Sequence, residues 1–349
     1  MVAHTTIGEL SESDLLARIL PVFAAGKGAG RGVLVPPGDD AAVLATGGSV
    51  VVTTDSMVRG MDWRDDWSSG HDVGLKLVAQ NVADVAAMGA VPTGLLIALA
   101  AAPATSLDWV VDLTDGIAAG AEDAGCPVVG GDLSSAPEGV VIVAVTAFGD
   151  LEGRAPVLRS GARPGDVVAV AGSLGWSGAG LALLLAGEAG PSDPRAGSER
   201  KAREGSVERA RSLVTWFHRS PRPPWEAGPV AAAVGASSMI DLSDGLVRDG
   251  GRIAAASGVE LALDERVLRE TFLAGVVADA VGEDEGWRQV LSGGEEHSLL
   301  ATFPPGAVPD DPSAPWTVIG EVVEAGAAGP RLTVGGAEPS VTGWDHFAG

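Results

Sequence analysis

The chain has 349 residues, a formal net charge of −23, 46% hydrophobic residues and a single cysteine, Cys126. This length suits two domains of ordinary size, and the hydrophobic content suits packed globular units. The acidic balance excludes nucleic acid and anionic membranes as partners, and one cysteine excludes an internal disulfide and a cysteine-based zinc cluster. We expect a cytoplasmic protein, because no apolar run reaches membrane-helix length and residues 1–20 lack the pattern of a secretory signal.

Strand and helix patterns alternate along the chain, which predicts an α/β or α+β architecture. Runs rich in β-branched residues predict strands at 50–56, 95–100, 139–150 and 166–172. Apolar residues at helical spacing predict helices at 9–20, 72–88, 106–124, 176–187 and 244–257. The stretch 151–165, rich in Arg, Gly and Pro, is typical of a domain seam. The polar segment 187–211 is expected to be an exposed excursion without chemistry.

Aspartates recur in five stretches beside apolar segments, where a charged side chain is costly in free energy because it is removed from water. The stretches are PGDDAAVL (37–44), VVVTTDS (50–56), the helical segment 71–90, PVVGGDLSS (127–135) and MIDLSDGL (239–246). Each aspartate has a plain alternative, since Asp at a strand end often forms a turn or caps a helix. A buried ionised carboxylate, however, must be paired or bind a metal, and basic residues are scarce in these stretches. Together the five stretches predict cation ligands.

The type of donor narrows the choice of cation. Carboxylate and hydroxyl oxygens suit Mg²⁺, Ca²⁺ or Mn²⁺ better than zinc or copper, and no stretch has the spacing of the calcium-binding loop. Mg²⁺ normally takes one or two protein carboxylates and completes its shell with water and phosphate. Several separated aspartates therefore favour several Mg²⁺ ions bridging to a polyphosphate, as in phosphoryl transfer.

Other motifs give weaker signals. AAGKGAGRG (24–32) lacks the Ser or Thr and the preceding strand of a Walker loop, so we interpret it as a plain loop. Residues 169–180 follow a strand and open a helix, but their glycines are out of register for a dinucleotide fingerprint. An alternative interpretation of residues 169–180, a helix N-terminus that binds phosphate, is left open. The five histidines show no paired metal-binding spacing, and no G-x-S-x-G elbow is present.

Two motifs near the C-terminus leave alternatives open. LSGGEEHSLL (291–300) places Glu295 and Glu296 after a glycine pair, where a tight turn with exposed acids is the plain interpretation. GWDHF (343–347) gathers two aromatic residues, an acid and a histidine. Its aromatic residues either pack in a core or stack on a planar ligand.

The motifs resemble, in type and order, those of the thiamine-monophosphate kinase family. The matching stretches are PGDDAAVL, TTDSMVRGMDW, NVADVAAMGAVP, VVGGD, LRSGARPGD, IDLSDGL, LSGGEEH and GWDHF, and only 187–211 and 304–316 fall outside the resemblance. It implies ATP-dependent phosphorylation of thiamine monophosphate to thiamine diphosphate. It also implies the aminoimidazole ribonucleotide synthetase-like fold, with an N-terminal α/β domain at 1–152 for metal and ATP, a C-terminal α+β domain at 153–349, and a homodimer paired through the N-terminal sheets.

The resemblance also implies a set of site residues. The Mg²⁺ ligands would be Asp40, Thr53, Thr54, Asp55, Asp84, Asp132, Asp241 and Asp244. ATP would contact Asp115, Gly131, Asp132, Arg159 and Ser243, and thiamine monophosphate would contact Asp62, Glu295 and Trp344. No general base is assigned, because a substrate phosphate with a second pKa of about 6 is largely dianionic at neutral pH.

One site position departs from the family pattern. Many members have histidine where this chain has Asp62. A carboxylate would repel the substrate phosphate unless a metal intervenes, so we expect Asp62 to contact the cationic thiamine rings instead.

The sequence leaves three rival functions. They are another ATP-dependent synthetase of the same superfamily, a non-catalytic binder of thiamine phosphates, and an NAD-linked oxidoreductase built on residues 169–180. The number of expected Mg²⁺ ligands argues against a simple binder, because binding alone does not need so many.

Overall fold

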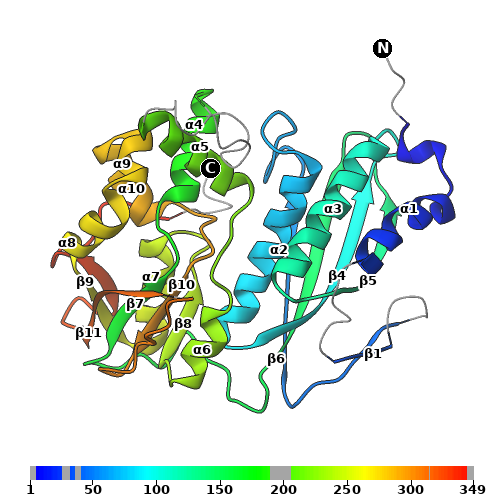
Figure 1. Ribbon diagram of the computed structural model, residues 1–349. Coiled ribbons are helices and arrows are strands. Elements are labelled where there is room, and N and C mark those ends of the chain that lie inside the picture. Colours follow the sequence, from blue (N-terminus) through cyan, green and yellow to red (C-terminus); the bar gives the residue numbers. More distant parts are fainter. Residues whose placement is uncertain (1–4, 26–31, 36–40, 189–205, 314, 344–349) are drawn as a thin grey trace. The chain divides into compact units, whose positions relative to one another are not determined.

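The computed structural model describes residues 5–25, 32–35, 41–188, 206–313 and 315–343 (Figure 1). The chain divides into two compact units, and each is described by itself. The first unit is Met1–Val85 with Ala90–Arg154, and the second is Ala86–Gly89 with Ala155–Gly349. Among the described residues, no helix combines the length and apolar content that crossing a bilayer requires.

A four-stranded sheet forms the centre of the first unit. Its strands lie in the order β3 (Val50–Val58), β6 (Val141–Asp150), β4 (Val91–Ala101) and β5 (Val128–Ser135). Neighbouring strands are antiparallel, except that β4 and β5 are parallel. The unit also contains a small ladder of β1 (Val33–Val35) and β2 (Val43–Leu44), the short helix η1 (Ile7–Glu9), and helices α1 (Glu12–Ala25), α2 (Gly70–Ala87) and α3 (Leu107–Asp123).

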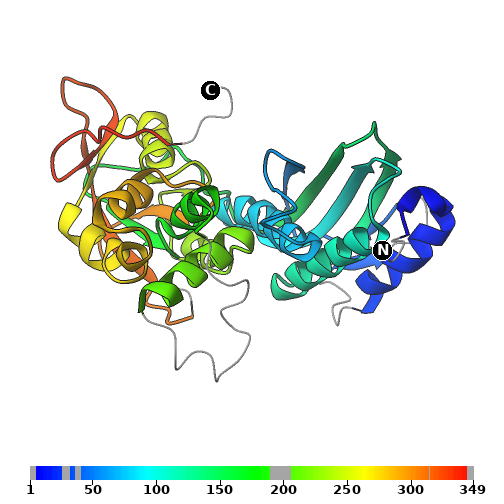
Figure 2. The same ribbon diagram turned by 90° about the horizontal axis from the view of Figure 1, so that it is seen from above.

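The two faces of this sheet differ in character. Helices α2 and α3 lie along one face (Figure 2). Buried and half-buried residues alternate along β6, as the two-residue period of a strand requires, and Val143 and Val145 are fully buried on the helix side. The strand register places Val50, Val52 and Leu96 together on the opposite face, where all three are exposed.

Helices α2 and α3 approach each other through glycines. A Cβ at Gly74 would lie 2.5 Å from Leu113 O and from Ile117 N, and one at Gly116 would lie 2.1 Å from His71 O. Real Cβ atoms do not come so close to backbone atoms, so only glycine permits this separation. The two helices are therefore in direct backbone contact where they cover the sheet.

A six-stranded sheet forms the centre of the second unit. Its strands lie in the order β12 (Arg331–Val334), β9 (Val259–Leu263), β11 (Trp316–Glu324), β7 (Val167–Ala171), β10 (Leu299–Phe303) and β8 (Ser238–Asp241), and only the β12–β9 pair is parallel. The helices are α4 (Trp176–Ala186), α5 (Ser206–Arg219), α6 (Ala227–Ala233), α7 (Leu246–Ser257), α8 (Glu265–Leu268), the π-helix η2 (Arg269–Leu273), α9 (Val276–Val281) and α10 (Glu283–Ser292).

Both faces of this second sheet carry a hydrophobic core. Val170 and Ile240 belong to the larger core, which includes residues of α4, α5 and α7. Ala169 and Phe303 point the other way, into a smaller core with Ala231 of α6. Strands covered on both faces are apolar along their whole length, which explains the continuous burial of β10.

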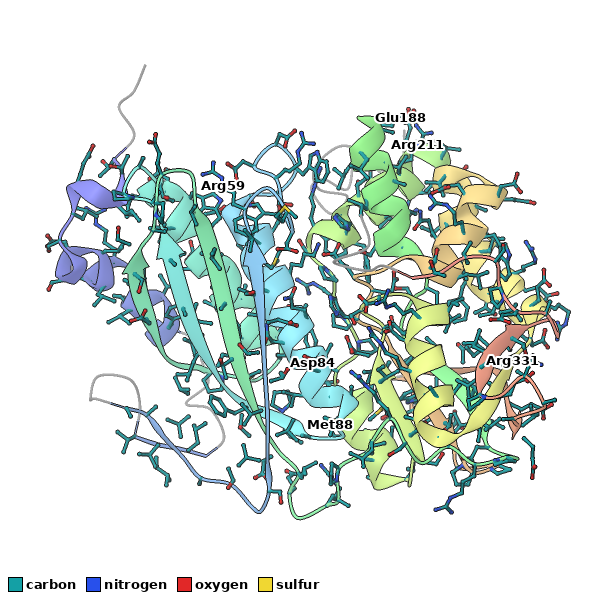
Figure 3. The ribbon with its side chains drawn as sticks, turned by 180° about the vertical axis from the view of Figure 1, so that it is seen from behind. Arg59, Asp84, Met88, Glu188, Arg211 and Arg331 are labelled. Atoms are coloured by element: carbon teal, nitrogen blue, oxygen red, sulfur yellow. The ribbon has the colours of Figure 1, made fainter. Side chains whose placement is uncertain are left out.

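Most elements predicted from the sequence are confirmed. The four predicted strands correspond to β3, β4, β6 and β7, and the five predicted helices correspond to α1 to α4 and α7. Most of the excursion expected at 187–211 lies outside the described residues, but its last part is helical, because α5 begins at Ser206 and Arg211 Nη1 lies 3.1 Å from Glu188 Oε2 (Figure 3). The antiparallel pairing of β7 with both neighbours argues against the rival dinucleotide-binding interpretation of residues 169–180, which requires a parallel sheet.

We predict that Gly116→Ala destabilises the first unit. The new Cβ would collide with the His71 carbonyl, and overpacking of this kind costs about 1–3 kcal/mol. Urea unfolding should therefore show a lower unfolding free energy. Gly251→Ala in α7 is the matched control: its Cβ would meet no atom within 4 Å, and it should gain up to about 1 kcal/mol of helix propensity. A Gly116→Ala protein as stable as its parent would contradict the backbone contact.

Candidate functional site

Two of the acidic motifs lie side by side in the second unit. The last residue of β8, Asp241, and the turn after β8 (242–245) run beside the segment 293–298, which leads into β10. Backbone hydrogen bonds join them: His297 N donates to Leu242 O at 2.9 Å, and Glu295 N donates to the Ser243 carbonyl at 2.7 Å. The predicted site residues Asp241, Ser243, Asp244 and Glu295 therefore share one end of the sheet.

Glu296 anchors the segment 293–298 to the start of α4. It is 1% exposed, and its Oε1 and Oε2 accept hydrogen bonds from Ser173 Oγ at 2.5 Å and Ser177 N at 3.0 Å. Burial raises the pKa of the Glu296 carboxyl, and these hydrogen bonds oppose the rise. The interpretation of Glu296 as an exposed acid of a turn is therefore wrong. The N-terminus of α4, which the sequence left open as a phosphate site, donates a hydrogen bond to this carboxylate.

The residues on either side of Glu296 adopt a left-handed backbone. Glu295 has φ of 58° and His297 has φ of 54°, which is strained for residues with a side chain. Glu295 Oε2 lies 3.5 Å from Nδ1 of the buried His218, and His297 Nδ1 lies 3.4 Å from Asp241 Oδ2. Neither histidine was predicted as a site residue, because neither has a metal-binding spacing in the sequence.

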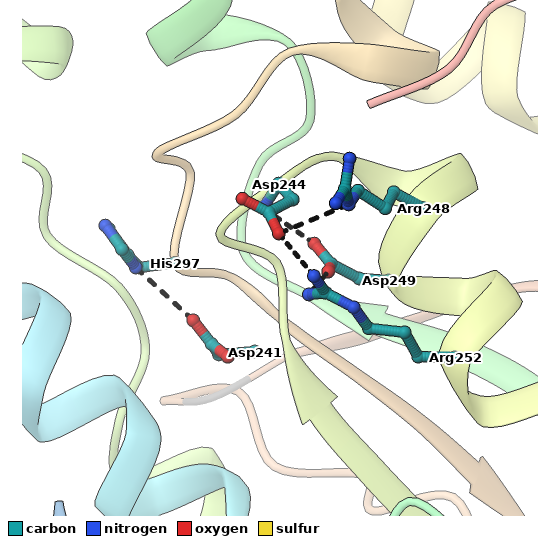
Figure 4. Close-up of polar contacts among 6 residues, drawn as sticks. All are labelled: Asp241, Asp244, Arg248, Asp249, Arg252 and His297. Atoms are coloured by element: carbon teal, nitrogen blue, oxygen red, sulfur yellow. Dashed lines mark hydrogen bonds and ion pairs between the residues drawn. The ribbon is translucent and has the colours of Figure 1, made fainter. Parts of the chain in front are cut away.

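Asp244 lies in a network of charged side chains from α7 (Figure 4). Arg252 Nη2 donates to Asp244 Oδ2 at 2.6 Å, and Arg248 Nε lies 3.5 Å from the same oxygen. The buried Asp249 accepts hydrogen bonds from Asp244 N at 2.8 Å and Arg252 Nη1 at 2.6 Å. Burial raises the pKa of Asp249 to about 7, against the effect of the Asp244 amide. Sequence analysis missed all three α7 residues, which resemble ordinary helix charges.

The other residues predicted in the second unit lie at the surface or outside the described chain. Arg159 is exposed, and its carbonyl accepts a hydrogen bond from Ser257 Oγ at 3.1 Å. A Cβ at Gly343 would lie 2.1 Å from the Asp244 carbonyl, so the chain returns to the turn after β8 at this point. Trp344 follows directly and lies outside the described residues.

The first unit brings three predicted metal ligands together between β3 and α2. Thr53 Oγ1 donates to Asp84 Oδ2 at 2.7 Å (Asp84 is labelled in Figure 3), and Asp55 lies two residues along the same strand face. The buried Asn81, one turn before Asp84 on α2, accepts a hydrogen bond from the Asp55 amide at 3.1 Å. Asn81 could have been found in the sequence as a polar residue within an apolar helix.

Thr54 and Asp132 lie on the opposite face of that sheet. Thr54 pairs with Thr146 and Asp132 pairs with Ala98, both on the face away from α2 and α3. Strands β3 and β5 are the two outer strands, so three spacings of about 4.8 Å separate them by roughly 14 Å. One chain therefore does not bring Asp132 next to Asp55 and Asp84.

The remaining predicted residues of the first unit have other surroundings. Gly131 lets β5 approach β4, because a Cβ there would lie 2.2 Å from the Ile97 carbonyl. Asp62 Oδ2 accepts a hydrogen bond from the Val58 amide at 2.7 Å and so closes the turn after β3. Asp115 is exposed on α3, and Asp40 lies outside the described residues.

The donor set fits Mg²⁺ bound partly by phosphate. Within the described ranges, no three carboxylate, imidazole or thiol side chains lie together as a ready-made metal cage. Mg²⁺ does not need such a cage, because it usually takes one or two carboxylates and keeps water and phosphate oxygens. The paired oxygens of Thr53 and Asp84, and the neighbouring carboxylates of Asp241 and Asp244, suit this mode of binding.

Comparison with known proteins identifies relatives along the whole chain. Residues 38–151 match the family described as AIR synthase related protein, N-terminal domain. The chain is 42% identical to a thiamine-monophosphate kinase of Mycobacterium tuberculosis over 346 residues, which cover 98% of this chain and 92% of the relative.

Solved structures give the same fold. The thiamine-monophosphate kinase of Stenotrophomonas maltophilia superposes with a TM-score of 0.77 at 27% identity, covering 95% of this chain and 98% of the other. AaThiL complexed with AMPPCP and TMP superposes with a TM-score of 0.71 at 28% identity, covering 97% and 98%. The two-domain architecture with mixed α/β content is that of these proteins.

We predict that Glu296 anchors its segment through hydrogen bonds. Glu296→Gln can still accept from Ser177 N and can donate to Ser173 Oγ, so its unfolding free energy should stay within about 1 kcal/mol of the parent. Glu296→Ala leaves these donors buried without their acceptor and should lose about 2–4 kcal/mol. Similar losses for the two variants would contradict this role.

The raised pKa of Glu296 adds a pH dependence to the same measurement. A folded-state pKa above the unfolded value means that the folded protein holds the proton more tightly. Stability from this group is therefore present below the unfolded pKa and is lost as pH rises through the folded pKa. Urea unfolding at several pH values should show this decline in the parent and a smaller one in Glu296→Gln.

Proposed function

We propose the function of this chain from one premise: the chain belongs to the thiamine-monophosphate kinase family. It catalyses the ATP-dependent phosphorylation of thiamine monophosphate, which yields thiamine diphosphate and ADP. The observation that carries this conclusion is the full-length similarity to thiamine-monophosphate kinases. The complex of a relative with AMPPCP and TMP, an analogue of ATP and the second substrate, supports it. We place this step of thiamine diphosphate biosynthesis in the cytoplasm.

The chemistry asks the protein for positioning and charge neutralisation. A phosphate oxygen of thiamine monophosphate attacks the γ-phosphorus of ATP in line, and the largely dianionic phosphate needs no general base. The obstacle is repulsion, because two unit charges about 4 Å apart cost on the order of 4 kcal/mol at an effective dielectric of 20. Bound Mg²⁺ supplies the positive charge that offsets this cost.

Residues of both units carry the proposed roles. The proposed Mg²⁺ ligands are Asp40, Thr53, Thr54, Asp55, Asp84, Asp132, Asp241 and Asp244. The proposed ATP contacts are Asp115, Gly131, Asp132, Arg159 and Ser243, and the proposed thiamine monophosphate contacts are Asp62, Glu295 and Trp344. The pairing of Thr53 with Asp84, and the shared position of Asp241, Ser243 and Asp244 beside Glu295, support these roles.

We also propose that two chains pair through the open face of the first unit's sheet. Val50, Val52 and Leu96 are 44%, 58% and 36% exposed on this face, which is apolar enough to be covered by a second copy. Thr54 and Asp132 lie on the same face near its opposite edges. A second copy of the sheet, packed across this face, would supply to Thr54 an Asp132 that its own chain holds too far away.

An assay against several substrates tests the function. Thiamine monophosphate, free thiamine and an aminoimidazole ribonucleotide precursor are each offered with ATP, with and without Mg²⁺, and ADP release is coupled to NADH oxidation. We expect release only with thiamine monophosphate and Mg²⁺. Turnover of the aminoimidazole precursor would favour a sister synthetase, and binding without turnover would favour a non-catalytic binder.

We predict that Asp241→Asn and Asp84→Asn each lower kcat by about 100-fold or more, since each removes a charge that holds Mg²⁺ at the polyphosphate. Asp284→Asn is the control, because Asp284 is an exposed acid in the first turn of α10. The coupled assay at saturating Mg²⁺ gives kcat, and circular dichroism confirms folding. Activity within a few-fold of the parent would contradict the metal-binding role.

We predict that Val52→Glu weakens the dimer, because it buries a carboxylate in the proposed apolar interface. Sedimentation equilibrium should show a dimer for the parent and a monomer for the variant at micromolar concentration. Val207 is 46% exposed in the first turn of α5, outside the proposed interface, so the control variant Val207→Glu should remain dimeric. A dimeric Val52→Glu protein would remove this face as the interface.

A further inference from the structure

Three residues around the turn after β8 form a closed ring of hydrogen bonds (Figure 4). Asp244 N donates to Asp249 Oδ2 at 2.8 Å, Arg252 Nη1 donates to Asp249 Oδ1 at 2.6 Å, and Arg252 Nη2 donates to Asp244 Oδ2 at 2.6 Å. The ring therefore fixes both the backbone and the carboxylate of Asp244. Nothing in the proposed function gives Asp249 or Arg252 a role.

Asp249 is the fixed point of this ring. Its side chain is 0% exposed and comes from the first turn of α7, so its position is set by the helix and by the core. Both of its oxygens accept a hydrogen bond, so Asp249 holds the Asp244 amide and the Arg252 guanidinium at the same time. Arg252 binds this buried acid through Nη1 and Asp244 through Nη2, so its pairing with Asp249 holds the guanidinium beside Asp244.

The ring leaves one defined oxygen of Asp244 for a cation. Arg252 and, at 3.5 Å, Arg248 both contact Oδ2. In the part of the chain that the structure describes, Oδ1 accepts no hydrogen bond from another residue. The side chain of Asp244 is 13% exposed, so a small cation can approach it but the carboxylate has little room to rotate.

We propose that Asp249 and Arg252 are positioning residues, which hold Asp244 as a one-oxygen ligand for the divalent cation. This inference rests on the proposed function, which makes Asp244 a cation ligand. Removal of a group that orients a metal ligand typically weakens metal binding by about 10- to 100-fold.

A direct electrostatic role is the main alternative, and charge arithmetic separates the two. The Asp249–Arg252 pair is neutral as a whole, so the pair adds little net charge beside the cation. Arg252→Gln makes the surroundings more negative, and Asp249→Asn makes them more positive. A purely electrostatic role would therefore strengthen cation binding in the first variant and weaken it in the second. Positioning predicts that both variants weaken it.

The chain offers a matched control for a merely structural ion pair. Arg331 Nε lies 2.8 Å from Glu260 Oε2 on neighbouring strands β12 and β9, and Arg331 is labelled in Figure 3. The exposed fractions of these two side chains are 34% and 13%, against 35% and 13% for Arg252 and Asp244. No predicted site residue belongs to this pair, so Arg331→Gln removes a similar ion pair away from the proposed site.

The test measures Mn²⁺ binding by electron paramagnetic resonance of the free ion, in the presence of AMPPCP. Asp244→Asn first identifies the class of Mn²⁺ sites that depends on Asp244. We expect Arg252→Gln and Asp249→Asn both to weaken that class about 10-fold or more, with Arg331→Gln unchanged. Arg252→Lys keeps the charge but cannot bridge two carboxylates, so it should also weaken binding. The Mg²⁺ concentration for half-maximal activity should rise in the variants that weaken Mn²⁺ binding and stay unchanged in Arg331→Gln.

Several results would overturn the inference. Tighter Mn²⁺ binding in Arg252→Gln, or parental binding in Arg252→Lys, would assign the effect to charge. Parental Mn²⁺ binding in both Arg252 variants would show that the ring has only a structural role. If Asp249→Asn does not fold, the two Arg252 variants alone still test the inference. A parent that fails to phosphorylate thiamine monophosphate would refute the proposed function, whereas the Mn²⁺ comparison among variants does not depend on turnover.

Discussion

The second unit depends on how it satisfies carboxylates that are out of reach of water. Removing an ionised carboxylate from water costs several kcal/mol unless donors or a cation compensate. Glu296 obtains its donors from Ser173 in the loop between β7 and α4 and from Ser177 in the first turn of α4. Asp249 obtains its donors from the Asp244 amide and Arg252. Each buried acid therefore ties one site segment to a rigid helix start, α4 in one case and α7 in the other.

This anchoring explains how the segment 293–298 maintains an unusual backbone. Left-handed φ values at Glu295 and His297 each cost about 1–3 kcal/mol, and strain of this size persists only where the surroundings impose it. Glu296 lies between the two strained residues, and its hydrogen bonds with Ser173 and Ser177 hold the segment in this conformation. The directions of Glu295 and His297 are thereby set by the backbone rather than by rotamer choice.

The sequence predicted the local structure around the proposed ligands Asp241 and Asp244. Asp241 and Asp244 follow an apolar run and precede a helix, and that context alone indicated a strand end. Asp249 and Arg252 have no such signal, because charges three residues apart on a helix usually face solvent. Their role depends on burial, which is a property of the tertiary structure.

Strand order sets a similar limit in the first unit. Strand alternation already implies that Thr53 and Thr54 point to opposite faces. The distance between Asp55 and Asp132 depends on the order β3-β6-β4-β5, which short-range sequence patterns do not specify. Sequence motifs therefore identify residues proposed for one function but do not show which of them meet within one chain.

The charge balance gives a physical reason for a metal-dependent site in so acidic a protein. With a net charge of −23, the chain repels polyphosphates at long range, and Arg252 beside Asp244 is already held by two carboxylates. Positive charge for a triphosphate and a phosphate must then arrive with the ligands, as divalent cations. The proposed function therefore requires that nucleotide binds as its metal complex, because each carboxylate that repels the free nucleotide attracts the cation bound to it.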